Sequence, residues 1–198
     1  TTESSDMGTV GGAGSYDEGS SVTLTASPKT GYEFSGWYEN NSLVSNSNPY
    51  EFNADRNHSF TAKFAVKQLH ITKDDTVVGG SYTVNPSIVD YNGSAMLTAV
   101  PDTEHSFSAW ESSADDGNSY TKFGNNAMQF RFSGITSDLI IRPVFTGIPF
   151  KVTFDANNGT GTQMATQDFT YNSGAILQKC TYTRTGYTFS GWNTKADG

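Results

Sequence analysis

The sequence predicts a mainly β protein made of a tandem array of small modules, each with at most one short helix. Composition is the first observation: glycines number 20, aromatic residues make up 13% of the chain, and no run rich in Ala, Leu, Glu and Lys occurs. Segments such as 22–26 and 32–37 alternate with period two, which gives a strand one buried and one solvent-facing side. The third observation is a signature, aromatic-x-Phe-Ser-Gly/Ala-Trp, that occurs three times.

The three copies of the signature divide the chain into modules at residues 1–65, 66–147 and 148–198. Segments 67–72 and 150–154 open the second and third modules as strands, and segments 58–64 and 138–145 close the first and second. The first module lacks a clear opening strand, which would fall near residues 1–3. The third stops soon after Trp192, so we expect it to be truncated, with a sheet edge that is frayed or paired with another chain.

Each signature places a phenylalanine three residues before a tryptophan, in the pairs Phe34 and Trp37, Phe107 and Trp110, and Phe189 and Trp192. This odd spacing directs the two side chains to opposite faces of a regular strand. Either a bulge at Ser35 and Gly36 returns them to one face, or the tryptophan packs against a neighbouring segment; we favour the bulge because glycine stands there. We expect these six residues to be a structural signature and not a sugar-stacking platform.

Tyrosines are better candidates than the tryptophans for stacking against a bound ligand. The candidates are Tyr38, Tyr50, Tyr120 and Tyr171, although each is equally an ordinary strand-surface tyrosine. Loop 111–126 interrupts the repetition in the second module and is the best candidate for a module-specific contact.

The charge balance argues against two classes of partner. The net charge is -8, with 12 basic and 20 acidic residues and no basic run, whereas nucleic-acid binders concentrate Lys and Arg. We therefore expect neither nucleic acid nor an anionic membrane surface as a partner. No apolar run reaches 18 residues, so we also expect no direct membrane insertion.

The sequence shows no catalytic motif, and we expect no enzyme activity, no metal and no cofactor. Neither a Gly-x-Ser-x-Gly elbow nor a His-Glu-x-x-His helix is present, and Cys180 is the single cysteine. The histidines, at 58, 70 and 105, stand in unrelated contexts. Acidic loops 115–118 and 155–159 carry oxygen ligands suited to calcium but lack the spacing of a calcium loop, so ordinary turn chemistry is favoured. The one helix-tolerant stretch is 162–168.

Two segments of the third module, Val-Thr-Phe-Asp-Ala-Asn-Asn-Gly at 152–159 and Thr-Arg-Thr-Gly-Tyr-Thr-Phe-Ser-Gly-Trp at 183–192, resemble the Listeria–Bacteroides repeat, the B-repeat of internalin-type surface proteins. Residues 8–64 resemble the divergent version of that repeat. The second module departs from it at Glu104, His105 and Ala109. The resemblance implies a β-grasp-like module that is arrayed in secreted or wall-anchored bacterial proteins and has no catalytic residues.

These expectations favour a spacer or stalk for adhesion, located outside the cell at the bacterial surface or wall. Small modules that contact only their neighbours along the same chain suit that role. The alternative is a module that itself binds a glycan or a host protein.

Overall fold

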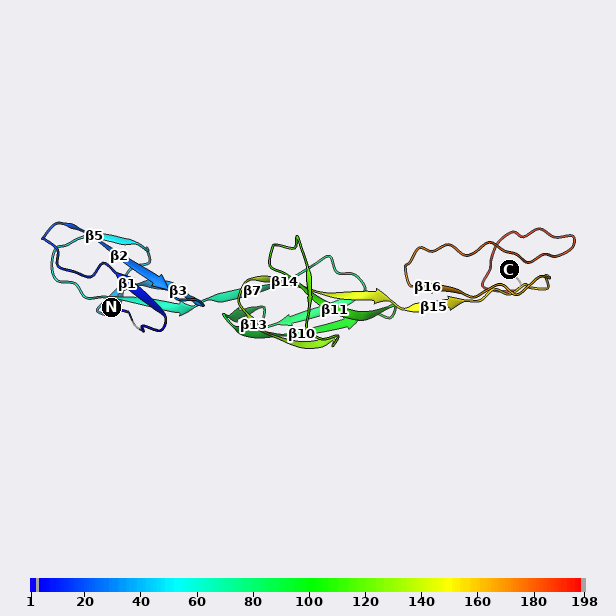
Figure 1. Cartoon of the computed structure of the whole chain (residues 1–198), viewed down its shortest axis with the longest axis horizontal. Coiled ribbons are helices and arrows are strands. Elements are labelled where there is room, and N and C mark those ends of the chain that lie inside the picture. Colours follow the sequence, from blue (N-terminus) through cyan, green and yellow to red (C-terminus); the bar gives the residue numbers. More distant parts are fainter. Residues whose placement is uncertain (3, 197–198) are drawn as a thin grey trace.

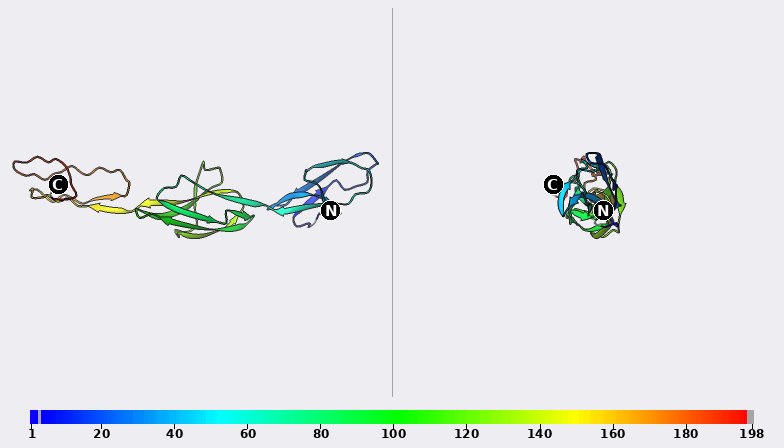
Figure 2. Two further views of the ribbon diagram at one scale, coloured as in Figure 1. Left: turned by 180° about the vertical axis from the view of Figure 1, so that it is seen from behind. Right: turned by 90° about the vertical axis from the view of Figure 1, so that its left-hand side faces the viewer.

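The chain forms three lobes that follow one another along a single axis (Figure 1). The computed structural model describes residues 1–2 and 4–196, and these residues contain strands, turns and irregular chain but no helix. Viewed from its end, the molecule is narrow (Figure 2). The predicted mainly β class of small modules is confirmed. We keep 1–65, 66–147 and 148–198 as the names of the three modules, and these boundaries remain our proposal.

The described residues of the first module form six strands, which make two sheets. The strands are β1 (Gly8–Gly11), β2 (Ser21–Pro28), β3 (Tyr32–Glu39), β4 (Ser42–Ser45), β5 (Tyr50–Asn53) and β6 (Phe60–Val66). One sheet has the order β1-β2-β5 and the other β4-β3-β6. Alternate residues of β2 are buried, as its period-two pattern predicts.

The second module repeats this arrangement with two further strands. Its strands are β7 (Gln68–Lys73), β8 (Gly80–Asn85), β9 (Ile88–Asp90), β10 (Gly93–Pro101), β11 (His105–Ser113), β12 (Thr121–Phe123), β13 (Gln129–Ile135) and β14 (Leu139–Gly147). The orders are β13-β10-β8 and β12-β11-β14-β7-β9. Since β1, β2 and β5 correspond to β8, β10 and β13, and β4, β3 and β6 to β12, β11 and β14, the two modules share one topology.

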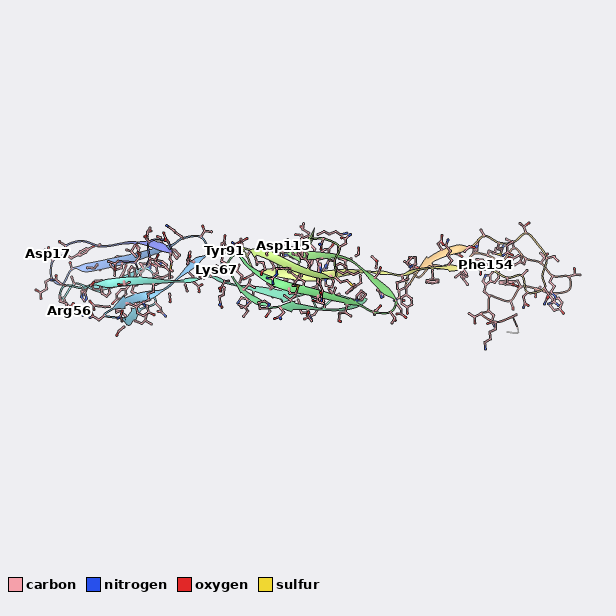
Figure 3. All side chains as sticks on the ribbon, turned by 90° about the horizontal axis from the view of Figure 1, so that it is seen from below. Asp17, Arg56, Lys67, Tyr91, Asp115 and Phe154 are labelled. Atoms are coloured by element: carbon pink, nitrogen blue, oxygen red, sulfur yellow. The ribbon has the colours of Figure 1, made fainter. Side chains whose placement is uncertain are left out.

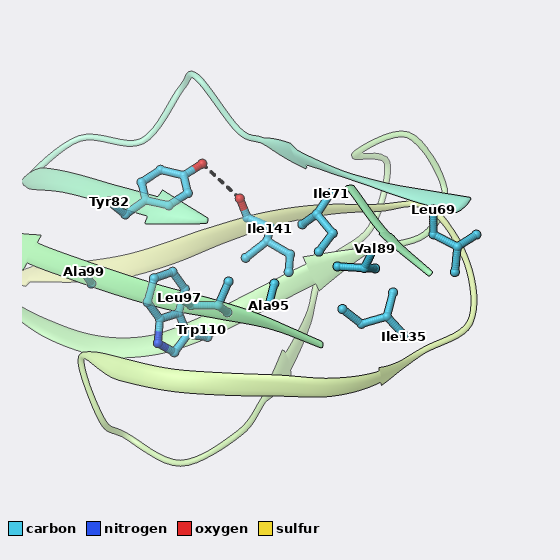
Figure 4. Packing of buried hydrophobic residues seen from close by; sticks show 10 residues of the cluster. All are labelled: Leu69, Ile71, Tyr82, Val89, Ala95, Leu97, Ala99, Trp110, Ile135 and Ile141. Carbon is cyan, nitrogen blue, oxygen red and sulfur yellow. Dashed lines mark hydrogen bonds between the residues drawn. The ribbon is translucent and has the colours of Figure 1, made fainter. Parts of the chain in front are cut away.

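Each of these modules encloses its own hydrophobic core. The first core contains Trp37, which is 1% exposed, and the second contains Trp110, which is 0% exposed. In the second core the Tyr82 hydroxyl donates a hydrogen bond to the Ile141 carbonyl at 2.9 Å (Figure 4). Burial raises the pKa of Tyr82 to about 12. The chain is therefore stabilised as separate cores and not as one continuous core.

A β-bulge turns the signature phenylalanine and tryptophan toward each other, as predicted. The register of β3 against β6 shifts between Phe34 and Gly36, and Gly36 has a φ of 152°. The register of β11 against β14 shifts at the same place. The ring centroids of Phe34 and Trp37 consequently lie 5.5 Å apart, within the range of favourable aromatic pairs.

The start of the chain takes the place of the opening strand that the sequence did not reveal. Thr2 forms a parallel bridge with Ala62 of β6, just as β7 runs parallel to β14 in the second module. The Thr1 amino group donates to the Phe60 carbonyl at 2.8 Å. The described residues of the first module therefore contain no opening strand like β7, as the sequence indicates, but one isolated parallel bridge occupies the equivalent position.

The third module contains one two-stranded sheet among the described residues. Strand β15 (Pro149–Val152) pairs with β16 (Gln167–Thr170), and a single bridge joins Thr160 to Thr183. Residues 162–166 are irregular and 167–168 begin β16, so the helix-tolerant stretch is not helical. Phe154 and Met164 are buried, but most of the module is exposed.

Candidate functional site

One residue joins the first module to the second. Strand β6 ends at Val66, β7 begins at Gln68, and Lys67 lies between them. The Lys67 N–H donates to the Gly31 carbonyl at 2.9 Å, and the Lys67 carbonyl accepts from the Tyr91 N–H at 2.8 Å. Figure 3 shows Lys67 and Tyr91 close together where the two lobes meet. The backbone of the connecting residue is thus held by hydrogen bonds from both modules.

The junction between the second and third modules has the same pattern. Ile148 lies alone between β14 and β15. Its N–H donates to the Glu104 carbonyl at 2.9 Å, and its carbonyl accepts from the Tyr171 N–H at 3.2 Å. Glu104 directly precedes β11 as Gly31 directly precedes β3, and Tyr171 follows β16 as Tyr91 follows β9. The two junctions therefore use equivalent positions of successive modules.

The two junction tyrosines pack in different ways. A Cβ placed on Gly31, whose φ is +86°, would lie 2.6 Å from the Tyr91 ring, so the ring lies directly on the glycine. Tyr171 instead approaches His105, with ring centroids 5.8 Å apart and the rings nearly perpendicular. The pKa of the Tyr171 hydroxyl is raised, first by its hydrogen bond with the Glu104 carboxylate and second by burial. Each junction thus adds a side-chain contact to its backbone hydrogen bonds.

The other three candidate tyrosines are engaged within their own modules. The Lys63 ammonium lies 4.7 Å from the Tyr38 ring centroid. Tyr50 stacks on Phe52 at 5.4 Å and packs against the first core. The Arg142 guanidinium lies 3.5 Å from the Tyr120 ring centroid. No ring contact found among residues 1–2 and 4–196 joins two of the four candidates, so the structure does not bring them together.

Segment 111–126, predicted as a loop, is partly strand, because residues 111–113 end β11 and Thr121–Phe123 form β12. The turn between these strands is held by its own polar groups. The Asp115 carboxylate accepts hydrogen bonds from the Ser113 hydroxyl at 2.6 Å and from the Ser119 N–H at 3.0 Å. Bonds from Ser113 and Ser119 lower the pKa of Asp115 to about 2. The acidic residue of this loop therefore organises the turn itself.

Hydrogen bonds between Tyr120, Asp74 and Arg142 connect this segment to strand β14. The Tyr120 hydroxyl donates to Asp74 at 2.8 Å, and Arg142 bonds both Asp74, at 3.3 Å, and Glu111, at 2.9 Å. Hydrogen bonds from the Thr76 hydroxyl and N–H, with those from Tyr120 and Arg142, lower the pKa of Asp74 to about 2. This network fixes the loop on the second module.

The signature residues differ between modules. The Trp110 indole N–H donates to the Ala127 carbonyl at 3.1 Å, whereas the buried Trp37 indole N–H has no hydrogen-bond partner in the part of the chain described. Phe34 and Phe107 are partly buried, but Phe189 is 55% exposed and Trp192 only half-buried.

Sequence reasoning missed Gly31, Lys67 and Tyr91 as junction residues. A usable signal existed, because the dipeptide Tyr-Asn at 91–92 recurs at 171–172. The described residues hold no group of three or more His, Cys, Asp or Glu side chains placed to bind a metal ion. They also include no helix with the length and apolar character needed to cross a membrane.

Comparison with known proteins gives the relationships of the chain. The model of the divergent InlB B-repeat domain matches residues 1–68 and 72–132, and the Listeria–Bacteroides repeat domain matches residues 150–198. A protein of Evansella cellulosilytica named "Putative membrane protein" is 27% identical over 184 residues, which cover 91% of this chain and 26% of that protein. No solved structure matches significantly. The chain therefore belongs to the divergent InlB B-repeat family and continues into a Listeria–Bacteroides repeat, which are repeat modules typical of bacterial surface proteins.

Proposed function

We propose that this chain is a non-catalytic spacer, a stalk that holds an adhesive domain of a bacterial surface or secreted protein away from the cell. The observation that carries the proposal is the repeated junction. Lys67 and Ile148 are each the single residue between two strands, and each is hydrogen-bonded on both sides. A spacer has to keep its length, and these junctions leave no free linker to fold back.

The length of a linker decides how freely modules reorient. Flexible linkers are typically Gly- and Ser-rich, and their reach grows with the square root of their residue number. Here the strand before each junction continues almost directly into the strand after it, from β6 into β7 and from β14 into β15. The elongated arrangement in Figure 1 follows from this continuity.

The extracellular location and the lack of enzyme activity belong to the same proposal. Both repeat families are modules of bacterial surface proteins, which supports a location at the cell surface or wall. The chain spans about a quarter of the length of the relative that it matches, so the role of any whole protein is itself a proposal. Binding of a glycan or host protein by the modules is the weaker proposal, because Tyr38, Tyr50 and Tyr120 already contact their own modules.

Distances between spin labels test the stalk. Thr23 on β2 and Thr83 on β8 are both exposed, and each can be replaced by cysteine in a Cys180→Ser background and labelled. Pulsed electron resonance should give one narrow distance distribution between the labels. Insertion of Gly-Ser-Gly after Val66 is the matched loosened variant and should broaden it. A distribution that is already broad without the insertion would remove the basis of the proposal.

A further inference from the structure

Strand β8 is an edge strand of the second module and carries no charged side chain. It lies at one end of the sheet order β13-β10-β8 and pairs with β10 in a regular register at every position from Gly80 to Asn85. Residues 76–89 contain no charged residue, in a chain whose net charge is -8. Charged side chains and bulges are common means of keeping an edge strand unpaired. Strand β8, all of whose residues are described, has neither.

The other edge strands described in the second module are protected. On the opposite edge of the same sheet, β13 carries Arg131, and its register against β10 shifts between Gly93 and Ser94. Strands β12 and β9 are the two edges of the other sheet, and each contains a charged residue, Lys122 and Asp90 respectively. Among the edge strands that the structure describes in this module, β8 alone is thus uncharged.

The backbone groups of Tyr82 and Val84 point to the free side of β8. The Ala99 N–H of β10 donates at 2.9 Å to the carbonyl of the residue that precedes β13. Because successive residues of a strand direct their backbone groups to opposite sides, Thr98 faces β8 and bonds its partner Thr83. The N–H and C=O groups of Tyr82 and Val84 therefore face away from β10. Within residues 1–2 and 4–196, these groups have no hydrogen bond to another segment.

The strand is complementary to a second copy of itself. When two copies of β8 run antiparallel with Thr83 opposite Thr83, Tyr82 of one copy pairs with Val84 of the other. Ser81 of one copy then pairs with Asn85 of the other, so every side chain keeps its own face of the sheet. Thr–Thr and aromatic–β-branched pairs are favourable cross-strand pairs. The outward N–H and C=O groups of Tyr82 and Val84 meet each other across this register.

The charges of the outer modules favour an antiparallel arrangement of the two chains. The first module contains 3 basic and 8 acidic residues, and the third contains 4 basic and 3 acidic residues. The strands of the second module run along the long axis of the molecule (Figure 1), so antiparallel strands give antiparallel chains. The acidic first module of each copy then lies on the side of the third module of the other copy and not beside a second acidic module.

We propose that two copies of this chain associate through β8, which pairs antiparallel with β8 of the second copy and joins two three-stranded sheets into one. The interface is two-fold symmetric, with Thr83 on the axis. Backbone hydrogen bonds between Tyr82 and Val84 of the two copies supply affinity. An antiparallel pair suits stalks that reach toward each other from two cells. This last consequence rests on the proposed function, whereas the pairing itself does not.

Association of the unmodified 198-residue chain is the first test. Analytical ultracentrifugation over about a hundredfold range of chain concentration, up to about 1 mM, should show a shift from monomer to dimer. Amide hydrogen exchange at Tyr82 and Val84 should slow as the concentration rises, while exchange at Thr83, which is already bonded to β10, should change little. A monomer at every concentration, or a dimer protected at another edge strand, would overturn the proposal.

The second test places a charge on the axis. Thr83→Lys brings two ammonium groups opposite each other and should raise the dissociation constant of the dimer by about fivefold or more. Gln129→Lys is the matched control, because Gln129 and Thr83 are both exposed and both pair with Thr98, from opposite edges of the sheet. The control should stay within about twofold of the unmodified chain. Equal weakening by the two substitutions would mean that β8 is not the interface.

Single spin labels in a Cys180→Ser background test the direction of pairing. A label on Thr83→Cys should show strong dipolar broadening in the dimer, whereas a label on Thr23→Cys should show none, because the two Thr23 positions lie at opposite ends of an antiparallel pair. Broadening at Thr23 would contradict the antiparallel arrangement. Dilution with unlabelled chain removes signals between copies and leaves the distance between Thr23 and Thr83 within one chain. The stalk can therefore fail while the pairing holds, and the reverse.

Discussion

The ring of Tyr91 lies directly on Gly31, although the two residues belong to different modules. A methyl group on residue 31 would meet that ring at 2.6 Å, closer than real Cβ contacts allow. Gly31 also has a φ of +86°, which L-residues rarely adopt. Glycine is thus required here both for its conformation and for the approach of the neighbouring module.

Gly31→Ala should loosen the first junction. The new methyl group displaces the Tyr91 ring, so the distance distribution between labels at Thr23 and Thr83 should broaden. Gly186→Ala is the matched control, because Gly186 has a similar φ of +82° with nothing within 4 Å of its Cβ position. That variant should cost about 1 kcal/mol of local backbone strain and leave the label distance unchanged. Equal broadening in both variants would show that the ring contact does not hold the junction.

Tryptophan-to-phenylalanine substitutions should have unequal costs. Trp110→Phe loses the hydrogen bond to the Ala127 carbonyl, whereas Trp37→Phe removes a buried N–H that has no partner among the described residues. We expect Trp110→Phe to lower the free energy of unfolding of its module by about 1–2 kcal/mol more than Trp37→Phe does. Urea unfolding followed by NMR, module by module, measures both. Equal losses of unfolding free energy in the two variants would mean that the Trp37 and Trp110 indole N–H groups are hydrogen-bonded to the same extent in solution.

Acid should weaken the second module through Asp74. The folded pKa of Asp74 is about 2, below its ordinary value of 3.8, so the ionised carboxylate contributes stability above about pH 4 that is lost as the pH falls toward 2. That contribution is on the order of 2 kcal/mol. Asp74→Asn should remove it at pH 7 and flatten the dependence between pH 4 and 2. Asp75→Asn, at an exposed neighbour, is the control and should retain the acid transition.

Tyr120→Phe should release loop 111–126 while leaving the module folded. The substitution removes the 2.8 Å hydrogen bond to Asp74 but keeps the ring that lies against Arg142. We expect a loss of about 1 kcal/mol and faster amide exchange at residues 114–120. Tyr16→Phe removes a 3.1 Å bond from an exposed tyrosine to the Gly12 carbonyl and should change stability by less than about 0.5 kcal/mol. Unchanged exchange in Tyr120→Phe would show that Ser113 and Asp115 suffice to hold the loop.

Local pattern was enough to predict β2, β3, β6, β7, β14, β15 and the bulge, but not the shorter strands such as β4, β9 and β12. The spacing between Phe34 and Trp37 left two arrangements open, and the glycine at 36 favoured the register shift that the structure shows. The pairing of Thr2 with Ala62 could not be predicted, because one residue in an isolated bridge shows no period-two pattern. The junctions were missed because Gly31 and Tyr91 meet only after two modules have folded, and neither residue is unusual in its own turn. The candidate tyrosines were chosen by residue type, which does not reveal partners such as Lys63 or Arg142.

The parallel pairing of β7 with β14 has a mechanical consequence. Chain enters the second module through β7 and leaves through β14, and Leu139, Ile140 and Ile141 lie beside Ile71, Thr72 and Lys73 in the same direction. A pull on the two ends therefore slides one strand along the other and loads their hydrogen bonds in shear, all at once, instead of peeling them apart in sequence. In the proposed stalk, a load along the chain would therefore be borne by this pair of strands.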